Sequence, residues 1–434
     1  MRTKDAHIVF IGIGGIGMSA LARHFLRRNV PVFGYDRTKT ALTEALEKEG
    51  ALLCYSDDVS SFPGWRAEET TVIYTPAIAP THPWRAFFES YNPIKRAAAL
   101  GLIAKGYKTL AVAGTHGKTS TSAILTHILT ESGLDPTAFI GGLLSTSGTN
   151  YRLGNGPWLI VEADEYDRSF LQLHPAAAAI TTSDADHLDI YADEADLTRT
   201  FDAFIQQVGG PTFSGTTLDS IIPAGTTGDH AFASNIRAHE GAYSFTLHVA
   251  QQTVETKLFM PGKHNVYNAV LAAALAHYAG AGLDHIATAL STFGGIKRRF
   301  EYHLKGQVTL IEDYAHHPTE LEALIDSVSE MYPGQSTLIC FQPHLYSRTR
   351  DFFEGFVRQL GRVHQCLILP IYAARESPIE GVSAEALAAQ IPTAETSSKE
   401  ALSLAVKQSK CAVVLVVGAG DVGDTVPQLK AALR

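Results

Sequence analysis

The sequence KTLAVAGTHGKTS at positions 108–120 decides the fold of the region around it. Its first half, Lys108–Ala113, is an apolar run of the kind that forms a buried β-strand. A glycine loop follows and ends in Gly-Lys-Thr at positions 117–119, and a helical pattern then runs from Thr121 to Glu131. Glycines let backbone N–H groups approach an anion, and the N-terminal end of a helix favours negative charge. The stretch therefore predicts a cradle for a phosphate group.

The end of this loop favours a nucleotide as the ligand. Lys118 would reach the terminal phosphates and the hydroxyl of Thr119 would coordinate Mg²⁺, as in P-loop proteins. The spacing is shorter than in the general motif, because only two residues separate Gly114 from Gly117. The alternative is an ordinary glycine-rich turn between a strand and a helix. Lys and Thr at the start of the helix favour the nucleotide.

Length and composition bound the class of protein. A chain of 434 residues exceeds the roughly 250–300 residues at which one core stops growing, so we expect two or three domains. The 45% hydrophobic and 18% charged residues are typical of a globular protein. A formal charge of −9 disfavours nonspecific binding of nucleic acid, because there is no basic excess to displace counterions from phosphates.

The cysteines and the N-terminal sequence indicate the cellular compartment and whether disulfide bonds are expected. Cys54, Cys340, Cys366 and Cys411 lie far apart without a Cys-x-x-Cys, which predicts neither a zinc ribbon nor a disulfide framework and favours a reducing compartment. No signal-peptide pattern precedes the first strand, and no apolar run approaches about 18 residues. We expect a cytoplasmic monomer or homodimer without membrane insertion.

A second glycine loop lies at the N-terminus. The apolar run His7–Ile13 enters GIGGIGMSA at positions 12–20, and a helical pattern continues to Arg28. The glycines match G-x-G-x-x-G between a strand and a helix. A second strand, Val32–Tyr35, ends in Asp36, about twenty residues on, where a carboxylate meets a ribose hydroxyl in Rossmann units. The motif fits a dinucleotide, another nucleotide diphosphate, or a tightly packed turn without a ligand.

Two further features precede the phosphate-loop strand. The strand Thr71–Tyr74 runs into Thr75–Pro83, whose three prolines predict a rigid loop rather than a helix. This loop is either a ligand loop at a strand end or a plain connection. Lys95 and Arg96 stand at the start of an alanine-rich helix. We expect both side chains to be solvated there, and the alternative is that they bind an anionic ligand.

Carboxylates crowd the ends of two central strands. Trp158–Val161 leads to EADEYD at positions 162–167, and Ala177–Thr182 leads to SDADHLD at positions 183–189. Strand alternation places Glu162 on the side of Asp164, with Glu165 on the other side. Like charges this close repel one another unless they share a cation. Oxygen ligands suit Mg²⁺ and one imidazole suits a second divalent ion, whereas the alternative is a set of solvated turns with N-capping aspartates.

The rest of the chain predicts an antiparallel addition and a third α/β region. Short alternating strands between residues 208 and 258 carry no obvious chemistry. An alanine-rich helix then runs to Ala279, with Asn265 as its expected N-cap. Flexible glycines and three cations at positions 293–300 mark a boundary. Beyond it, polar residues follow four expected strands, as at ligand-binding sheet edges: Val308–Ile311, Thr337–Phe341, Cys366–Ile371 and Cys411–Val417.

Together these motifs resemble the Mur ligases of peptidoglycan synthesis. The resemblance covers the whole chain in order and rests on GIGGIGMS at 12–19, GTHGKT at 114–119, EADE at 162–165, DH at 186–187, HNVYN at 264–268, DYAHHP at 313–318 and FQPHLYSR at 341–348. It implies an α/β fold of three domains. These are a Rossmann-like N-terminal domain for the UDP-substrate at 1–104, a central P-loop ATPase-like domain at 105–295, and a smaller Rossmann-like C-terminal domain at 296–434 that contacts the amino acid and ATP.

The resemblance also implies an activity. The motifs are similar to those of the branch that joins L-alanine to the lactyl carboxylate of UDP-N-acetylmuramate through an acyl phosphate, with ATP and Mg²⁺, or Mn²⁺ in its place. This reaction belongs to cell-wall precursor synthesis, on which cell shape and division depend. Phosphoryl transfer of this kind needs positioning and charge neutralisation more than a covalent nucleophile.

The family motifs imply a role for individual residues. The implied catalytic residues are Lys118, Glu162, His187, His344 and Arg348. The implied metal ligands are Thr119, Glu162 and His187. ATP would contact Gly114, Thr115, His116, Gly117, Lys118, Thr119, Ser120, Asn265, Asn268, Arg298, Arg299 and Asp313. The UDP-substrate would contact Gly12, Gly14, Gly15, Ile16, Gly17, Asp36, Thr75 and His82.

One departure and three alternatives remain open. Several Mur ligases use a carbamylated lysine beyond the metal histidine, yet residues 188–206 contain no lysine. The related ligase that attaches a whole tripeptide in cell-wall recycling shares the acidic motif but normally differs in the first glycine loop. A nicotinamide-dependent oxidoreductase would explain the first loop alone, and a nonenzymatic nucleotide sensor would show no turnover.

Overall fold

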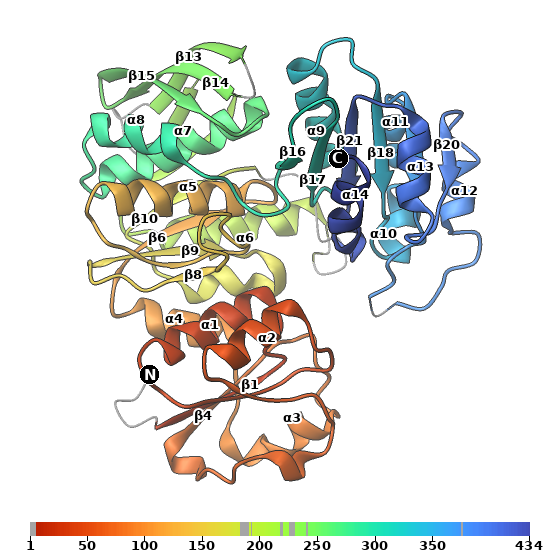
Figure 1. Cartoon of the computed structure of the whole chain (residues 1–434). Helices are drawn as coiled ribbons and strands as arrows, with labels where there is room; N and C mark the ends of the chain where they lie inside the picture. Colours follow the sequence, from red (N-terminus) through yellow and green to blue (C-terminus); the bar gives the residue numbers. More distant parts are fainter. Residues whose placement is uncertain are drawn as a thin grey trace. The chain divides into compact units, whose positions relative to one another are not determined.

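The computed structural model shows three α/β regions, each built on its own sheet (Figure 1). They form two compact units. The first unit holds the N-terminal and central sheets, and the second holds the C-terminal sheet together with Ile236–Ser244 and Leu258–His264. The structure describes residues 6–182, 191, 193–217, 220–224, 231–239, 242–374 and 376–434. Within these residues, no helix has the length and apolar character needed to cross a membrane.

The N-terminal region is a parallel sheet in the order β3-β2-β1-β4-β5. Because β1 lies between β2 and β4, the chain leaves it toward opposite sides, and this switch point is where ligands bind in such sheets. Its elements are β1 (His7–Ile11), α1 (Ile16–Leu26), β2 (Val32–Tyr35), α2 (Ala41–Lys48), β3 (Leu52–Cys54), the short 3₁₀ turns Val59–Ser61, Ala67–Glu69 and Glu89–Tyr91, β4 (Thr70–Tyr74), α3 (Pro83–Phe87), β5 (Ile94–Lys95) and α4 (Arg96–Ala104).

The predicted proline-rich loop ends one residue earlier than expected. Helix α3 begins at Pro83, where the fixed φ of proline suits the first helical position. The ring nitrogen Nδ1 of His82 accepts a hydrogen bond from the backbone N–H of Trp84 at 3.3 Å and caps the helix. The third proline therefore starts a helix instead of stiffening a loop.

The central region is a mixed sheet in the order β15-β14-β13-β12-β11-β10-β6-β9-β7-β8. Strands β11, β10, β6, β9 and β7 are parallel to one another, and β8 is antiparallel to β7. Strand β12 is antiparallel to β11 and β13, as expected for the predicted antiparallel addition. The strands are β6 (Lys108–Ala113), β7 (Thr137–Phe139), β8 (Tyr151–Arg152), β9 (Trp158–Ala163), β10 (Ala177–Ile180), β11 (Thr212–Thr217), β12 (Ser220–Ala224), β13 (Ala231–His239), β14 (Ala242–Val249) and β15 (Gln252–Leu258).

Helices cover this central sheet and correct two expectations. They are α5 (Lys118–Glu131), the 3₁₀ segment Tyr166–Gln172, α6 (Glu194–Gln206), α7 (Lys263–Tyr278) and α8 (Leu283–Thr292). Helix α5 begins at Lys118, three residues before the predicted start at Thr121, because the loop closes directly into the first turn. The prediction of Asn265 as an N-cap is wrong, since α7 begins two residues before it and its side chain is buried.

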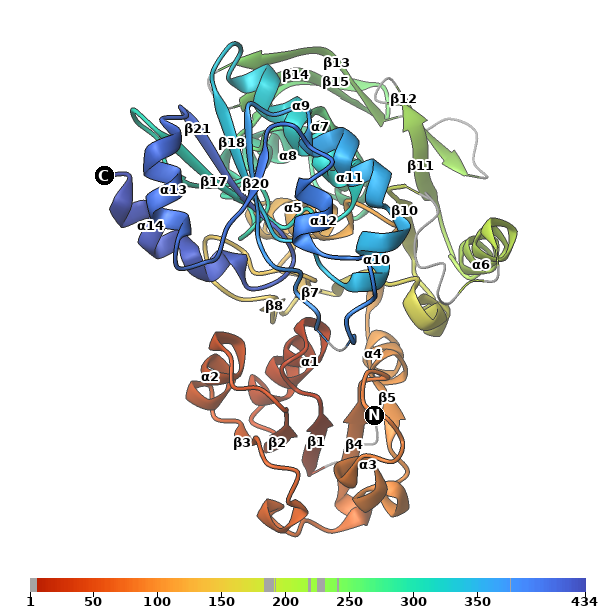
Figure 2. The same cartoon turned by 90° about the vertical axis from the view of Figure 1, so that its right-hand side faces the viewer.

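The C-terminal region is a sheet in the order β16-β17-β21-β18-β19-β20, parallel except for β16. Figure 2 shows α13 and α14 on one side of this sheet and α11 on the other, in agreement with two separate buried clusters. The elements are β16 (Glu301–Leu304), β17 (Thr309–Asp313), α9 (Pro318–Met331), β18 (Thr337–Phe341), α10 (Tyr346–Asp351), α11 (Phe353–Leu360), β19 (Gln365–Ile368), α12 (Ala384–Ala388), β20 (Ala394–Thr396), α13 (Leu402–Ser409), β21 (Val413–Val417), the 3₁₀ turn Val422–Thr425 and α14 (Val426–Ala432).

The four cysteines match the expectation of reduced thiols. Cys54, Cys340, Cys366 and Cys411 are all free and buried. Burial raises the pKa of the Cys366 thiol to about 12, so this group stays protonated at neutral pH and packs as a small apolar side chain.

Candidate active site

The loop between β6 and α5 has a backbone that needs glycine. Gly114 and Gly117 have φ values of +124° and +84°, which side-chain-bearing residues rarely adopt. A Cβ atom on Gly114 would lie 2.2 Å from Oγ1 of Thr181, and one on Gly117 would lie 2.6 Å from Oδ1 of Asn268. The two glycines therefore let the loop lie directly against β10 and α7.

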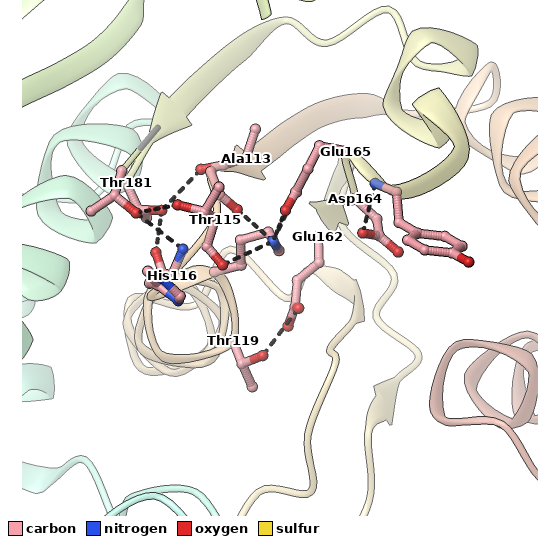
Figure 3. Close-up of polar contacts among 12 residues, drawn as sticks. Ala113, Thr115, His116, Thr119, Glu162, Asp164, Glu165 and Thr181 are labelled. Carbon is pink, nitrogen blue, oxygen red and sulfur yellow. Dashed lines mark hydrogen bonds and ion pairs between the residues drawn. The ribbon is translucent and has the colours of Figure 1, made fainter. Parts of the chain in front are cut away.

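Two threonines after β10 hold this loop in place. The backbone N–H of Thr115 donates to the carbonyl of Thr182 at 2.9 Å, and the N–H of His116 donates to its hydroxyl at 3.0 Å. The hydroxyl of Thr181 donates to the carbonyl of His116 (Figure 3). Sequence reasoning missed both threonines. Their place at the end of a strand that neighbours β6 was the available signal, because parallel strand ends meet at one sheet edge.

Lys118 is held at the loop by a buried carboxylate. Its Nζ lies 2.9 and 2.8 Å from the two carboxylate oxygens of Glu165, whose side chain is fully buried, and it also donates to the carbonyl of Gly114. The predicted phosphate-binding lysine is thus held in one position, and its counter-charge is Glu165 of the acidic motif EADEYD at 162–167. The sequence showed Glu165 but not its partner.

Thr119 and Glu162 point toward each other from α5 and β9 (Figure 3). The Thr119 hydroxyl donates to Oε2 of Glu162 at 3.1 Å, and the Ser122 hydroxyl donates to Oε1 at 2.9 Å. The backbone N–H of Gly141 also donates to Oε1. Burial raises the pKa of Glu162 above its ordinary range, which means that a nearby cation would stabilise the ionised form.

These oxygen donors fit Mg²⁺. A hydroxyl and a carboxylate in contact are the ligands that this hard cation prefers, and the raised pKa of Glu162 identifies a carboxylate whose charge is incompletely compensated. Thr119 and Glu162 are therefore suited to hold one ion. His187, the third predicted ligand, lies outside the described residues.

The remaining carboxylates of the acidic motif bind cations of the protein itself. Oδ2 of Asp164 lies 3.1 Å from Nη2 of Arg96, and Oδ2 of Asp167 lies 2.7 Å from Nζ of Lys95. Asp164 therefore faces Arg96, whereas Glu162 faces Thr119. The helix start predicted at Lys95 and Arg96 is confirmed, and Lys95 is exposed there, although both side chains also form ion pairs with the acidic motif.

The N-terminal glycine loop is closed by a carboxylate. Oδ2 of Asp36 accepts the N–H of Gly14 at 2.7 Å, so the predicted ribose-binding group binds the loop itself. A Cβ atom on Gly12 would lie 2.5 Å from Cγ2 of Thr75, which places Thr75 against the loop. His82 lies further along the edge, where its Nε2 is 3.2 Å from the Tyr35 hydroxyl.

The N-terminal glycine loop leads into α1, and the start of this helix lies beside the guanidinium group of Arg96. Gly15 is the N-cap of α1, and Ile16, its first residue, is exposed. A Cβ atom on Gly17 would lie 2.8 Å from Nη1 of Arg96. The same arginine binds Asp164, so it lies between the first glycine loop and the acidic motif. Sequence reasoning named Arg96 only as a minority candidate for an anion contact.

The asparagines of α7 are arranged beside the phosphate loop. Nδ2 of Asn268 donates to Oδ1 of Asn265 at 3.2 Å, and both side chains are buried. Since Asn268 approaches Gly117, the structure brings this predicted ATP residue to the loop that contains Lys118.

In the second unit, Asp313 is the last residue of β17 and accepts hydrogen bonds from two backbone N–H groups. Its two oxygens accept the N–H groups of Phe300 at 2.7 Å and Ala315 at 2.8 Å. Burial nevertheless raises the pKa of Asp313 to about 6, against the opposing effect of the Arg299 charge. The predicted strand ended at Ile311, so the structure moves Asp313 from a loop onto the strand itself.

The two predicted arginines differ in their surroundings. Arg298 lies 3.0 Å from Oε1 of Glu312 through Nε and donates to the carbonyls of Gly418 and Gly420, the latter at 3.0 Å. Arg299 makes a looser pair with Glu320, at 3.7 Å. Arg298 is thus bound to the C-terminal sheet by three contacts, whereas Arg299 has a single, longer ion pair with Glu320.

His344 and Arg348 form a separate cluster after β18. The ring of His344 stacks on Tyr372 with centroids 5.6 Å apart, and Nη1 of Arg348 lies 3.5 Å from its Nδ1. Burial, together with the charges of His316 and Arg348, lowers the pKa of His344 to about 4. The imidazole is therefore neutral at pH 7. This cluster and Asp313 belong to the second unit, whereas Lys118 and Glu162 belong to the first.

The fold and these sites define an α/β nucleotide-binding protein with a lysine-bearing phosphate loop beside a carboxylate suited to Mg²⁺. Residues 7–108 match the Mur ligase family catalytic domain, residues 112–276 the Mur ligase middle domain, and residues 298–420 the Mur ligase glutamate ligase domain. The chain belongs to the Mur ligase family.

Its relatives match nearly the whole length. The UDP-N-acetylmuramate–L-alanine ligase of Christiangramia forsetii is 44% identical, with 98% of this chain and 97% of the relative covered. The enzyme of the same name from Flavobacterium johnsoniae is 42% identical, with 99% and 98% covered. Among solved structures, the UDP-N-acetylmuramate-alanine ligase of Thermotoga maritima superposes with a TM-score of 0.83 at 25% identity, with 98% of this chain and 99% of that chain covered. The fold class predicted from sequence is confirmed.

Proposed function

We propose that the protein is an ATP-dependent ligase that joins L-alanine to the lactyl carboxylate of UDP-N-acetylmuramate. The observation that carries this proposal is the contact between Thr119 and Glu162 beside Lys118, in a chain that matches ligases of this name along nearly its full length. The same comparisons support this activity over a tripeptide ligase or a nicotinamide-dependent oxidoreductase. The reaction supplies a peptidoglycan precursor, and we place it in the cytoplasm.

The first step activates the carboxylate. A lactyl oxygen attacks the γ-phosphorus of ATP, a C–O–P bond forms, and the bond to ADP breaks, so that an acyl phosphate and ADP result. Lys118 neutralises charge on the β- and γ-phosphates, and the backbone N–H groups of the loop orient them. Mg²⁺, held by Thr119 and Glu162 with His187 as a further ligand, would supply charge neutralisation at the phosphate oxygens.

The second step forms the amide. The amine of L-alanine attacks the acyl carbon, a tetrahedral intermediate forms, and phosphate leaves as the amide C–N bond is completed. We assign the alanine carboxylate to Arg348, whose fork of donors suits a carboxylate. His344 is neutral at pH 7 and is able to accept a proton from the attacking amine.

The three α/β regions divide this work. We assign residues 1–104 to the UDP-substrate through the loop from Gly12 to Gly17, residues 105–295 to ATP and Mg²⁺, and residues 296–434 to the amino acid and the far side of ATP. Asn265 and Asn268 would contact the adenine side. Arg299 and Asp313 would contact phosphate and ribose.

An amino-acid-dependent ADP-release assay tests the proposal. We expect ADP release only when UDP-N-acetylmuramate, L-alanine, ATP and Mg²⁺ are all present, with one phosphate released per ADP. Turnover that requires the tripeptide L-alanyl-γ-D-glutamyl-meso-diaminopimelate instead of L-alanine would identify the recycling activity. A change in absorbance of reduced nicotinamide with no ADP release would refute the ligase outright.

A further inference from the structure

A hairpin loop in the central region touches both the substrate region and the metal carboxylate. Strands β7 and β8 are antiparallel, and residues 140–150 connect them, of which 141–150 form the hairpin loop. The loop is closed by backbone hydrogen bonds from Ile140 to Asn150 at 2.9 Å, from Leu144 to Thr149 at 3.0 Å and from Gly148 to Leu144 at 2.8 Å. These three bonds join the two arms of the connection along its length.

One end of this loop holds the start of α1. Asn150 is fully buried, and its Nδ2 donates to the carbonyl of Ile16 at 2.6 Å and to the hydroxyl of Ser19 at 3.1 Å. Its Oδ1 accepts a hydrogen bond from Nη1 of Arg23, which is itself buried and paired with Glu49. The amide nitrogen thus binds the first turn of α1, directly after the N-terminal glycine loop, and the amide oxygen binds the last turn through Arg23.

The other end of the loop holds Glu162. The N–H of Gly141 donates to Oε1 of this carboxylate. A Cβ atom on Gly141 would lie 2.3 Å from Oε2 and 2.9 Å from the carboxyl carbon, so that any side chain here would displace the carboxylate. The φ of Gly141 is not positive, and therefore steric conflict with Glu162, not backbone conformation, requires the glycine.

We propose that the hairpin loop 141–150 is a positioning element of the reaction, with Asn150 and Gly141 as its positioning residues. Asn150 sets the UDP-substrate loop and Gly141 sets Glu162, so that one closed stretch of backbone fixes the substrate region relative to the metal carboxylate. This inference rests on the proposed function for the identity of the substrate. Alignment of the lactyl carboxylate with the γ-phosphate requires this relative placement, since misplacement by about 1 Å costs about 100-fold in rate.

Asn150→Asp tests the first end. Aspartate keeps the shape and the acceptor for Arg23 but replaces the Nδ2 donor with an oxygen that repels the Ile16 carbonyl. We expect KM for UDP-N-acetylmuramate to rise about tenfold and kcat to fall, with KM for ATP within twofold of wild type. The matched control is Asn155→Ala, since Asn155 binds Asp135 and touches neither α1 nor Glu162. A variant whose kcat and KM for UDP-N-acetylmuramate both stay within twofold of wild type, or whose KM for ATP rises equally, would overturn the assignment of Asn150.

Gly141→Ala tests the second end with a readout that needs no UDP-substrate. We expect the Mg²⁺ concentration that supports half-maximal binding of an ATP analogue to rise about tenfold, because the added methyl group displaces Glu162. Gly106→Ala is the control, since a Cβ atom there meets its nearest atom at an ordinary 3.5 Å. An unchanged Mg²⁺ requirement would overturn the assignment of Gly141.

The double variant tests whether both ends act through one element. We expect the fall in kcat of Asn150→Asp with Gly141→Ala to be smaller than the product of the two single effects, whereas independent sites would multiply. If the fall in kcat of the double variant equals the product of the two single falls within experimental error, the two residues act independently and the shared role is overturned. Failure of the proposed function is distinguishable, because wild-type protein would then show no L-alanine-dependent turnover while the Mg²⁺ titration of Gly141→Ala still gives an answer.

Discussion

The two glycine loops of the first unit occupy similar positions between a strand and a helix, but they differ in the charged residues that contact them. Each follows a central parallel strand and opens a helix, α1 or α5. The loop at Gly114–Thr119 contains its own cation, Lys118, which is held by Glu165. The loop at Gly12–Gly17 contains no charged residue, and Asp36 occupies the N–H of Gly14 while Arg96 approaches from α4.

This difference shows that a glycine loop defines where an anion approaches and the surrounding charges define which anion. A lysine beside a Thr119–Glu162 oxygen pair suits a triphosphate with Mg²⁺. A neutral loop with one arginine from another helix suits a less charged diphosphate without a metal of its own.

Lys118→Ala is expected to give the largest effect. Removal of the loop's cation should lower kcat by a factor on the order of 10³, because charge stabilisation of the transferring phosphoryl group is lost. Binding of UDP-N-acetylmuramate, measured by calorimetry, should stay within twofold of wild type, since the other loop is untouched. Lys105→Ala, at an exposed position, is the control. A matching loss of UDP-substrate binding would break the distinction between the loops.

The second prediction concerns the free energy of unfolding, to which the ion pair between Lys118 and Glu165 contributes. Lys118→Met removes the cation partner of a fully buried carboxylate, and breaking such a pair costs about 3–5 kcal/mol. We expect the double variant Lys118→Met with Glu165→Gln to recover part of this free energy of unfolding without recovering activity. Urea denaturation monitored by circular dichroism measures it. Equal stability of the single and double variants would mean that the pair contributes nothing to the fold.

Arg96→Gln tests the charge environment of the N-terminal glycine loop. If this arginine serves the N-terminal loop, KM for UDP-N-acetylmuramate should rise about tenfold, which corresponds to about 1.4 kcal/mol for a charge-assisted hydrogen bond. KM for ATP should change by less than twofold. Arg27→Gln on the exposed end of α1 is the control. An effect confined to KM for ATP would assign Arg96 to the central site through Asp164 instead.

The smallest effect concerns pH and Asp313 in the second unit. Because burial raises the pKa of this carboxyl to about 6, the folded state binds a proton that the unfolded state binds only near pH 4. Asp313 therefore destabilises the fold above pH 6, and this destabilisation is relieved as the pH falls from 6 to 4. Asp313→Asn should remove that dependence, so that its stability relative to wild type declines toward pH 4 in thermal unfolding. A pH-independent difference between the two proteins would contradict the shifted pKa.

Much of the architecture follows from residue pattern alone. The apolar runs His7–Ile13 and Lys108–Ala113, each entering a glycine loop, predicted strands β1 and β6 because a continuous apolar run of that length suits a strand buried on both faces. The C-terminal strands were predicted for the same reason. Helix starts were less certain, since Lys118 and Pro83 begin helices through capping and loop closure that a hydrophobic pattern does not show.

The site divides in the same way. Sequence alone determined the chemistry that is local in the chain: glycines that permit a strained turn, a lysine and a threonine after them, and a carboxylate at the end of a strand. It did not determine partners that lie far apart in sequence. The pairs Lys118–Glu165, Arg96–Asp164 and Asn150–Ile16 span 47, 68 and 134 positions.

These pairs form only in the folded chain, and for Lys118 and Glu165 the physical reason is sheet order. Because β6 lies between β9 and β10, strands distant in sequence end side by side, and their carboxylates and hydroxyls meet one loop. In a sequence, Glu162, Asp164 and Glu165 look like one acidic cluster. In the fold each faces a different element, and Glu162 is the one that lies beside Thr119.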